Sequence, residues 1–256
     1  MGTTRARRSL QPERFMKLRH ILVLVPLFAL ACNAPQANIA PPCPTTAAVI
    51  PLSAAVADEI SLEQLKLLLP RHPITVGFDV DDTLIFSAPA FNALQPRYDP
   101  DVIRPKSYEA LSPDQKAKFH EFWNKLNEEY DDRSIPKKIG QRLLDLHIAR
   151  GDDIVIISKR QSTFPAPAAD ACTKRYEKMF NVKLPHPVIQ TQLKDKTPFI
   201  CRAHIDYYYG DADTDVTAAV AAGAVPIRVK RAAASYSKDK THNGQLGEIV
   251  LKDSER

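Results

Sequence analysis

From residue 60 onward the sequence alternates between two hydrophobic patterns, and this alternation limits the possible folds more than any other feature. Short apolar runs bounded by charged or turn-forming residues predict strands, and longer amphipathic segments predict helices. Strands that alternate with helices form a parallel sheet covered by helices on both faces, which is the α/β class. The predicted strands span residues 74–80, 152–158, 188–189, 205–209 and 225–229.

Capping residues mark the ends of the predicted helices. Ser61 and Gln64 have capping-box spacing, and Ser112 followed by Pro113 is typical of a second helix start. Gly151 is typical of a helix stop. The predicted helices span residues 61–70, 136–150, 168–180 and 216–222, with another from 112 through an apolar stripe at Phe119, Phe122, Trp123, Leu126 and Tyr130.

The basic net charge of the chain is confined to its N-terminus. The formal net charge is +5 over 256 residues, and residues 1–20 hold six basic residues against one acid, Glu13. The remaining bases and acids are equal in number, which excludes a general attraction to nucleic acid. With 44% hydrophobic and 25% charged residues, the composition is that of a globular protein of one or two domains.

The N-terminal segment is typical of an export signal. Residues 21–31 form an apolar run that follows a basic region and is shorter than the ~20 residues of a membrane span. We therefore predict a signal peptide over residues 1–31, with Met16 as an alternative start. The run ends at Cys32 and resembles a bacterial lipobox, although Ala29 stands where leucine is usual. We expect a periplasmic protein, either an envelope lipoprotein attached through a lipidated Cys32 or a plainly secreted one; a buried N-terminal helix is the structural alternative.

The rest of the chain divides into a tether and a folded domain. Residues 32–59 are rich in Pro and Ala and have no helical or strand period, which predicts a tether or arm. Residues 60–256 are the predicted domain. An oxidising compartment permits a disulfide between Cys172 and Cys201, and two separate buried thiols are the alternative.

Two groups of aspartates directly follow predicted strands. Residues 79–83 read Asp-Val-Asp-Asp-Thr, and residues 210–215 read Gly-Asp-Ala-Asp-Thr-Asp. Carboxylates at strand ends repel each other unless a cation lies between them. Because parallel strands place their carboxyl ends at one edge, the two groups predict a site for a hard divalent cation, for which Mg²⁺ is the best candidate. Neither group has the Gly and Glu that an EF-hand loop requires.

Two further side chains belong to the same edge of the predicted sheet. Ser158 ends the apolar run at 152–158, and Lys196 begins a later helix. The order Asp-x-Asp, apolar run with Ser, Lys, and Gly-Asp-x-Asp-x-Asp resembles the four motifs of haloacid dehalogenase-like phosphohydrolases. The resemblance implies a Rossmannoid three-layer sandwich: a central parallel sheet between helices, with a small helical insert, or cap, after the first strand.

Longer stretches are similar to class B bacterial acid phosphatases. They are FDVDDTLIFSAPAF at 78–91, FW at 122–123, SIPK at 134–137, YGDADTDVTAA at 209–219, PIRVKRA at 226–232 and GQLGEIV at 244–250. This similarity implies an exported, Mg²⁺-dependent enzyme that hydrolyses phosphomonoesters, including nucleotides and aryl and sugar phosphates. It also implies a homotetramer and an insert at residues 86–133.

The residues and the resemblance together predict the catalytic roles. A phosphomonoester is a dianion, so a carboxylate attacks it only once Mg²⁺ and Lys196 neutralise its charge. Asp79 is the predicted nucleophile, which forms an aspartyl-phosphate. Asp81 protonates the leaving alcohol and then takes a proton from water. In the family the metal is held by side chains matching Asp79 and Asp211 and by the backbone carbonyl matching Asp81. Asp215 is expected to support a metal-bound water.

The predicted phosphate contacts include a departure from the family. Ser158, through its hydroxyl, and the backbone of Lys159 are expected to bind phosphoryl oxygens. The family reads Thr-Gly-Arg where this chain reads Ser158-Lys159-Arg160. The lysine adds bulk and charge, and either tighter anion binding or a reshaped rim would follow. Asp82 and Asp213 are expected to point outward or to cap helices.

Three aromatic residues match positions that line the substrate pocket of the family. Phe91, Trp123 and Tyr236 would stack a nucleobase or aryl group of the substrate. Packing within the insert is the alternative for Phe91 and Trp123. Residues 233–236 do not reproduce the family's Asn-Ser-Thr-Tyr, which weakens the assignment of Tyr236. The seven histidines share no ligand spacing and are expected to be structural, which excludes the histidine-nucleophile phosphatases.

Two other functions stay open for this sequence. A phosphotransferase would pass the phosphoryl group from Asp79 to an alcohol instead of water. A non-catalytic envelope lipoprotein would use the same fold to bind a ligand or partner, although it would need neither Asp79 nor Asp81. A response-regulator receiver domain is excluded, because it lacks the Gly-Asp-x-Asp-x-Asp strand end and is not exported.

Overall fold

The computed structural model describes residues 59–163, 171–237 and 239–256. The predicted export signal, Cys32 and the tether up to residue 58 lie outside the described residues. Within the described ranges, no helix is long and apolar enough to cross a membrane.

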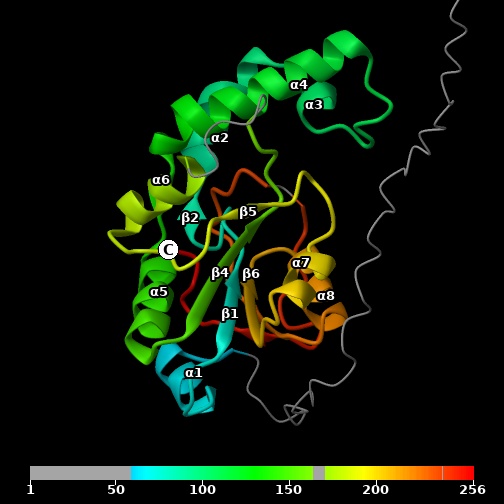
Figure 1. The fold of residues 1–256 in the computed structure, drawn as a ribbon. Coiled ribbons are helices and arrows are strands. Elements are labelled where there is room, and N and C mark those ends of the chain that lie inside the picture. Colours follow the sequence, from blue (N-terminus) through cyan, green and yellow to red (C-terminus); the bar gives the residue numbers. More distant parts are fainter. Residues whose placement is uncertain (1–58, 164–170, 238) are drawn as a thin grey trace, which may run out of the picture. The chain divides into compact units, whose positions relative to one another are not determined.

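A six-stranded parallel sheet forms the centre of the fold (Figure 1). Its strands are β1 (Thr75–Phe78), β4 (Asp153–Ser158), β5 (Ile189–Gln190), β6 (Tyr207–Gly210), β7 (Val225–Arg228) and β8 (Ile249–Val250). They lie in the order β5-β4-β1-β6-β7-β8, and every neighbouring pair is parallel. The chain adds β4 and β5 on one side of β1 and then returns to add β6, β7 and β8 on the other. Such a reversal opens a crevice at the carboxyl ends of the central strands, where α/β proteins bind ligands.

Helices flank this sheet, and the predicted cap at Ser61 and the predicted stop at Gly151 are confirmed. They are α1 (Leu62–Leu68), α5 (Lys138–Arg150), α6 (Ala171–Phe180), α7 (Thr197–Arg202) and α8 (Asp213–Ala221). Ser61 and Gln64 form the predicted capping box of α1, with the Gln64 N–H donating to Ser61 Oγ at 3.2 Å. Gly151 ends α5 in the left-handed conformation, with φ of 74°. That conformation suits glycine because it has no Cβ.

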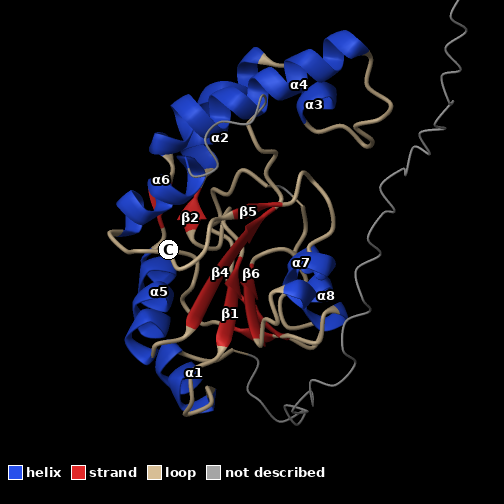
Figure 2. Ribbon diagram, in the orientation of Figure 1, coloured by secondary structure: helices blue, strands red, loops and turns tan. Residues whose placement is uncertain are grey.

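The two faces of the sheet carry separate apolar clusters, because side chains alternate along each strand. Val76 and Phe78 of β1 pack on the face covered by α1, α5 and α6. Val155 and Ile157 of β4 pack on the opposite face, under α7 and α8. Figure 2 shows these helices on either side of the strands. The predicted α/β fold with helices on both faces is thereby confirmed.

Residues 88–133 pack around an apolar cluster of their own. The segment comprises α2 (Ala88–Leu94), η1 (Gln95–Arg97), α3 (Pro100–Ile103), α4 (Pro113–Lys125), the π-helical turn η2 (Leu126–Tyr130) and η3 (Asp131–Arg133). The whole predicted stripe from Phe119 to Tyr130 is buried in this cluster. A two-stranded antiparallel ribbon of β2 (Ile85–Phe86) and β3 (Ile135–Pro136) brackets the segment. This is the stretch expected to form the insert.

The structure corrects several predicted boundaries. Helix α5 begins at Lys138 rather than at residue 136, because Pro136 pairs with Ile85 in the β2–β3 ribbon. Helix α8 begins at Asp213 rather than at residue 216, because the aspartates of the second acidic group form its first turn. Strands β2, β3 and β8 were not predicted, since two residues are too few to show a period.

The cysteines of the described residues do not pair with each other. Cys201 is disulfide-bonded and Cys172 is a free thiol, so the Cys172–Cys201 disulfide that the sequence allowed is wrong. Burial raises the pKa of the Cys172 thiol to about 11. This thiol therefore stays protonated and unreactive near neutral pH.

Candidate active site

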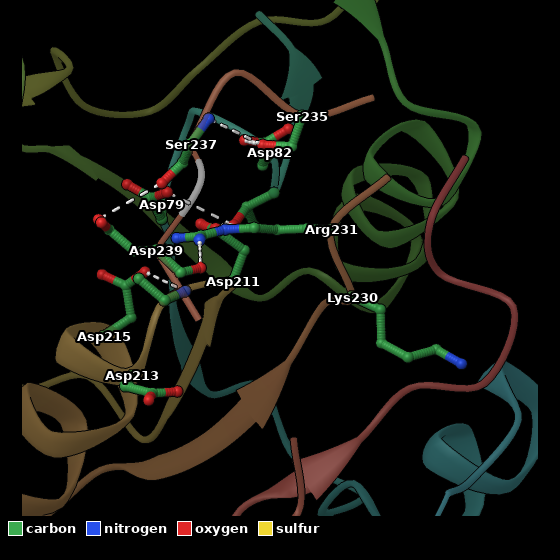
Figure 3. Close-up of polar contacts among 12 residues, drawn as sticks. Asp79, Asp82, Asp211, Asp213, Asp215, Lys230, Arg231, Ser235, Ser237 and Asp239 are labelled. Carbon is green, nitrogen blue, oxygen red and sulfur yellow. Dashed lines mark hydrogen bonds and ion pairs between the residues drawn. The ribbon is translucent and has the colours of Figure 1, made fainter. Parts of the chain in front are cut away.

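Three acidic side chains meet at the carboxyl ends of β1 and β6. Asp79 directly follows β1, Asp211 directly follows β6, and Asp215 lies in the first turn of α8. All three are buried, and each offers a carboxylate oxygen within 4.8 Å of the others. Figure 3 shows their side chains gathered at this edge of the sheet. The structure thus brings together the two acidic groups that lie far apart in the sequence.

A single buried lysine links two of these carboxylates. Lys196, the N-cap residue of α7, donates from Nζ to Asp79 Oδ1 and, at 2.8 Å, to Asp215 Oδ1. Burial raises the pKa of the Asp79 carboxyl well above its usual range; Lys196 opposes the rise, and Asp215 and Asp211 add to it. Burial by itself lowers the pKa of Lys196, but Asp215 and Asp79 outweigh it and raise this pKa well above its usual range. The lysine is therefore a fixed positive charge beside Asp79.

The acidic site fits a hard divalent cation. Burial raises the pKa of Asp211 to about 6; repulsion from Asp215 adds to the rise, and the Arg231 guanidinium, which donates to Asp211 Oδ2, opposes it. Three carboxylates thus face two positive side chains, Lys196 and Arg231. An all-oxygen donor set of this kind suits Mg²⁺ or Ca²⁺ rather than a soft metal. Asp79, Asp211 and Asp215 are the side chains that would hold the cation.

The carboxylate of Asp81 is held by one arginine. Arg160 donates from Nε to Asp81 Oδ2 at 2.9 Å and from a terminal nitrogen to Oδ1 at 2.7 Å. Burial raises the pKa of the Asp81 carboxyl, but the charge and hydrogen bonds of Arg160 outweigh burial and lower this pKa overall. The Asp81 side chain is 30% exposed, and its charge lies close enough to Asp79 to raise the pKa of that carboxyl.

The residues predicted to bind phosphate lie at the end of β4. Ser158 is buried, and its Oγ accepts a hydrogen bond from the Arg160 N–H at 3.1 Å. Lys159 is half-buried and donates from Nζ to Thr214 Oγ1 at 3.1 Å, and Thr214 is the residue before Asp215. The lysine that replaces the family's glycine therefore spans from β4 to the start of α8, beside the acidic site.

The three predicted aromatic residues lie together in the apolar cluster of residues 88–133. Phe91 and Trp123 are 6% and 8% exposed and meet edge to face, with centroids 6.2 Å apart. Tyr236, from the far end of the chain, stacks on Phe91. Arg104 Cζ lies 3.8 Å from the centroid of the Tyr236 ring. The aromatic surfaces thus contact one another and Arg104.

Comparison with known proteins identifies the family. The chain is 38% identical over 203 residues to the class B acid phosphatase of Haemophilus parainfluenzae, covering 76% of this chain and 80% of that protein. It is 34% identical over 240 residues to the class B acid phosphatase of an Enterobacter species, covering 90% and 94%. The chain belongs to the class B acid phosphatase family. It is an acid phosphatase, and the non-catalytic alternative is set aside.

Two other comparisons add little to the assignment of this class B acid phosphatase. No family model matches the chain. A solved haloacid dehalogenase-like hydrolase from Streptococcus pneumoniae is 14% identical and covers 71% of this chain and 95% of its own, with a TM-score of 0.46. A phosphoserine phosphatase structure reaches a TM-score of 0.45 at 14% identity and covers 72% and 95%.

Two aspartates of the acid phosphatase, which were expected to point outward or to cap helices, instead contact side chains from distant parts of the chain. Asp82 is buried with φ of 60°, and its Oδ2 accepts from Ser235 Oγ. Asp213 accepts from Arg228 at 2.9 Å and from His242 Nδ1 at 2.6 Å. Both aspartates thus tie the chain beyond β7 to the edge of the site, and neither belongs to the three-carboxylate cluster.

Three side chains at the site of this phosphatase were not predicted. Thr83 Oγ1 lies 3.5 Å from Asp79 Oδ2 and 3.4 Å from Asp211 Oδ1. Arg231 and Arg160 pair with an acidic residue each, as described above. Thr83 and Arg231 stand inside stretches that carry the family resemblance, and Arg160 stands in the stretch that departs from the family at Lys159. A lone Thr or Arg in such a stretch does not reveal its partner.

Proposed function

We propose that this acid phosphatase is an exported, Mg²⁺-dependent hydrolase of phosphomonoesters that works through an aspartyl-phosphate on Asp79. The observation that carries the proposal is the buried cluster of Asp79, Asp211 and Asp215 joined by Lys196. A nucleophilic carboxylate, a fixed cation and a place for a divalent metal are the parts that phosphoryl transfer to a carboxylate requires.

Charge neutralisation is the first requirement of the proposed reaction. Mg²⁺, held by the Asp79 and Asp211 side chains and the Asp81 carbonyl with Asp215 beside them, would supply neutralisation of the phosphate dianion. Lys196 contributes a second positive charge at Asp79 Oδ1. Asp79 Oδ2 then forms a bond to phosphorus as the ester oxygen departs.

Phosphate binding and proton transfer fall to the residues around Asp79. The Ser158 hydroxyl and the backbone N–H of Lys159 bind the phosphoryl oxygens. Asp81 gives a proton to the departing alcohol oxygen, so the alcohol leaves neutral. In the second half of the reaction the Asp81 carboxylate takes a proton from water, and the resulting hydroxide oxygen displaces Asp79 from phosphorus. An alcohol in place of that water would make the enzyme a phosphotransferase.

The proposed substrates are phosphomonoesters with a planar leaving group, including nucleotides and aryl phosphates, together with sugar phosphates. The support is the cluster of Phe91, Trp123 and Tyr236, whose rings can stack on a planar group. No role for nucleic acid is proposed. A homotetramer is proposed from the family resemblance, and mass photometry of the purified chain tests it.

Export to the periplasm is proposed from the N-terminal sequence and one structural observation. Cys201 is disulfide-bonded, and disulfides are typical of oxidising compartments. Cell fractionation with a Cys32→Ser variant separates the two forms of export. An envelope lipoprotein would move from the membrane fraction to the soluble periplasmic fraction, whereas a secreted protein would not change.

The decisive experiment measures phosphate release from an aryl phosphate and from nucleotides by the full chain, with Mg²⁺ and with chelator. We expect metal-dependent release that falls by at least about 10⁴-fold in Asp79→Asn, because the nucleophile is lost. Asp153→Asn is the matched control, since Asp153 lies at the opposite end of β4 and contacts only exposed His186 in the described residues, apart from backbone bonds. Full activity in folded Asp79→Asn would overturn the mechanism. Product analysis with added alcohol separates hydrolysis from transfer.

A further inference from the structure

The Asp81 carboxylate cannot turn freely, because Arg160 holds both of its oxygens. The two nitrogen–oxygen distances of 2.9 and 2.7 Å form a bidentate, fork-to-fork pair. This geometry fixes the plane of the carboxylate as well as its position, which a lysine could not do. The Ser87 side chain also donates to this carboxylate, and a proton can sit on a lone pair that neither donor uses.

The guanidinium of Arg160 also forms an ion pair with a second buried carboxylate. Its side chain is 1% exposed, and its remaining terminal nitrogen forms an ion pair with Asp131 Oδ1 at 2.9 Å, without the alignment of a hydrogen bond. Asp131 is also 1% exposed, and it accepts from Ser134 Oγ at 2.8 Å and from Tyr176 Oη at 3.3 Å. A line of contacts therefore runs from η3 through Arg160 to Asp81.

Stability does not account for this line of charges. Removing buried charges from water costs more than their attraction commonly returns, and apolar residues of similar volume often serve stability better. Two carboxylates also share a single arginine here. Asp81, by contrast, lies two residues beyond Asp79 at the carboxyl end of β1, and its side chain is 30% exposed. A restrained carboxylate beside a nucleophile is useful when it must meet one atom of the substrate.

We infer that Arg160 and Asp131 act as a positioning pair for Asp81, with Asp131 fixing the guanidinium and the guanidinium aiming the Asp81 carboxyl at the leaving oxygen. The inference rests on the proposed function, in which Asp81 transfers a proton. As the bond between phosphorus and the ester oxygen breaks, its electron pair goes to that oxygen, and the Asp81 proton joins it there. Asp79 Oδ2 supplies the new bond to phosphorus.

The leaving group provides a readout that a merely structural role would not change. An alkoxide departs only with a proton, whereas p-nitrophenolate departs without one. Because kcat/KM reports only the steps up to departure of the leaving group, misplacement of Asp81 lowers kcat/KM for an alkyl phosphate, such as glycerol 2-phosphate, and spares kcat/KM for p-nitrophenyl phosphate. The later attack of water, in which Asp81 is the base, is common to both substrates. An Arg160 that bound the phosphate itself would instead slow both substrates alike or raise KM.

The test compares Arg160→Lys and Asp131→Asn with a matched arginine variant, Arg175→Lys. Arg175 also contacts Asp131, at 3.7 Å, but not Asp81. For both test variants we expect kcat/KM for glycerol 2-phosphate to fall about 100-fold, within the usual range for general acid catalysis, and kcat/KM for p-nitrophenyl phosphate to fall less than about threefold. Arg175→Lys should change neither. Should Arg160→Lys fail to fold, Asp131→Asn carries the same test with the arginine in place.

A double-variant cycle then asks whether Arg160 acts through Asp81. Adding Arg160→Lys to Asp81→Asn should cause no further loss on glycerol 2-phosphate, because the aimed group is already gone. Equal losses of kcat/KM on the two substrates, a change in KM alone, or additive losses in the cycle would overturn the inference. The wild-type chain reports separately on the proposed function: absence of Mg²⁺-dependent release from either substrate would count against that function itself.

Discussion

The rings of Phe91 and Tyr236 are stacked, with centroids 4.1 Å apart and planes 16° from parallel. Atoms in contact lie ~3.5–4 Å apart, so no third ring fits between these two. The outer face of Tyr236 is covered by Arg104. A planar leaving group can therefore stack in this pocket only if Tyr236 moves off Phe91 or the group takes the place of Arg104.

Replacing Tyr236 tests whether this ring serves the substrate. We expect Tyr236→Ala to raise KM for nucleotides and aryl phosphates about two- to tenfold, the equivalent of the ~0.5–1.5 kcal/mol of one aromatic pair. KM for glycerol 2-phosphate should not change. Steady-state kinetics measure both, and Tyr98→Ala, which removes a ring that meets Phe122 in the same cluster, is the control. A lower KM for nucleotides would instead mean that Tyr236 merely blocks the pocket.

Metal binding should stabilise the folded chain. A cation between Asp79, Asp211 and Asp215 removes their mutual repulsion and binds only the folded state. At a Mg²⁺ concentration 100 times Kd, the gain is about 2.7 kcal/mol, or a rise in Tm of ~5–10 °C. Differential scanning fluorimetry with Mg²⁺ and with EDTA measures this shift. Asp211→Asn should lose most of it, and Asp153→Asn should retain it. An equal shift in Asp211→Asn would place the cation elsewhere.

Substitutions at two glycines distinguish packing inside the sheet from the geometry of the acidic site. A Cβ on Gly77 would lie 2.5 Å from the Tyr208 ring, and a Cβ on Gly210 would overlap the Asp215 side chain. We expect Gly77→Ala to cost ~1–3 kcal/mol of stability while keeping the Mg²⁺ response. Gly210→Ala should lose both the Mg²⁺ response and activity, because Asp215 is displaced. Phosphatase activity and the Mg²⁺-induced shift in Tm of the folded variants test both expectations. Wild-type activity in Gly210→Ala would contradict the prediction.

The buried His147 should make stability depend on pH. His147 donates from Nδ1 to Asp152 at 2.6 Å and accepts at Nε2 from the Tyr209 hydroxyl at 2.8 Å. Burial lowers the pKa of this imidazole, although Asp152 opposes it. The unfolded chain, with a pKa near ~6.5, therefore binds a proton more readily, and the free energy of unfolding falls as pH drops below that value.

The variant His147→Gln isolates this effect. It should be less stable than wild type by ~1–3 kcal/mol at neutral pH, and the difference should shrink as the pH is lowered below ~6.5. Urea unfolding at several pH values measures the stability difference and its dependence on pH. His186→Gln, at an exposed pair with Asp153, should follow the wild-type curve. A pH-independent difference would show that His147 has the same pKa in the folded and unfolded states.

The unusual Lys159 should strengthen substrate capture through its charge. We expect Lys159→Gly to raise KM for phosphomonoesters several-fold at low salt with little change in kcat, and the effect should shrink at ~1 M salt, where the screening length is ~3 Å. Lys159→Gln keeps most of the length of the side chain without its charge and should have the same effect as Lys159→Gly. If only the glycine variant differs from wild type, bulk rather than charge matters at this position.

The longer strands, the main helices and the acidic edge of this phosphatase are readable from the sequence. A buried strand such as β1 has an apolar run, and Asp79 and Asp211 stand directly after their strands, so local pattern and connectivity predict both the fold and the meeting of the acids. The capping box at Ser61 and the stop at Gly151 were predicted for the same reason, because each depends on residues a few positions apart.

Tertiary structure alone decided which groups pair across the fold. Lys196 meets Asp79 over a separation of 117 residues, and Arg160 meets Asp81 over 79. The stacking of Tyr236 on Phe91 and the free thiol of Cys172 are of the same kind. Periodicity reports which side of an element is buried, but not which distant side chain lies opposite it. That choice follows from strand order and helix packing, which set distances that no local pattern contains.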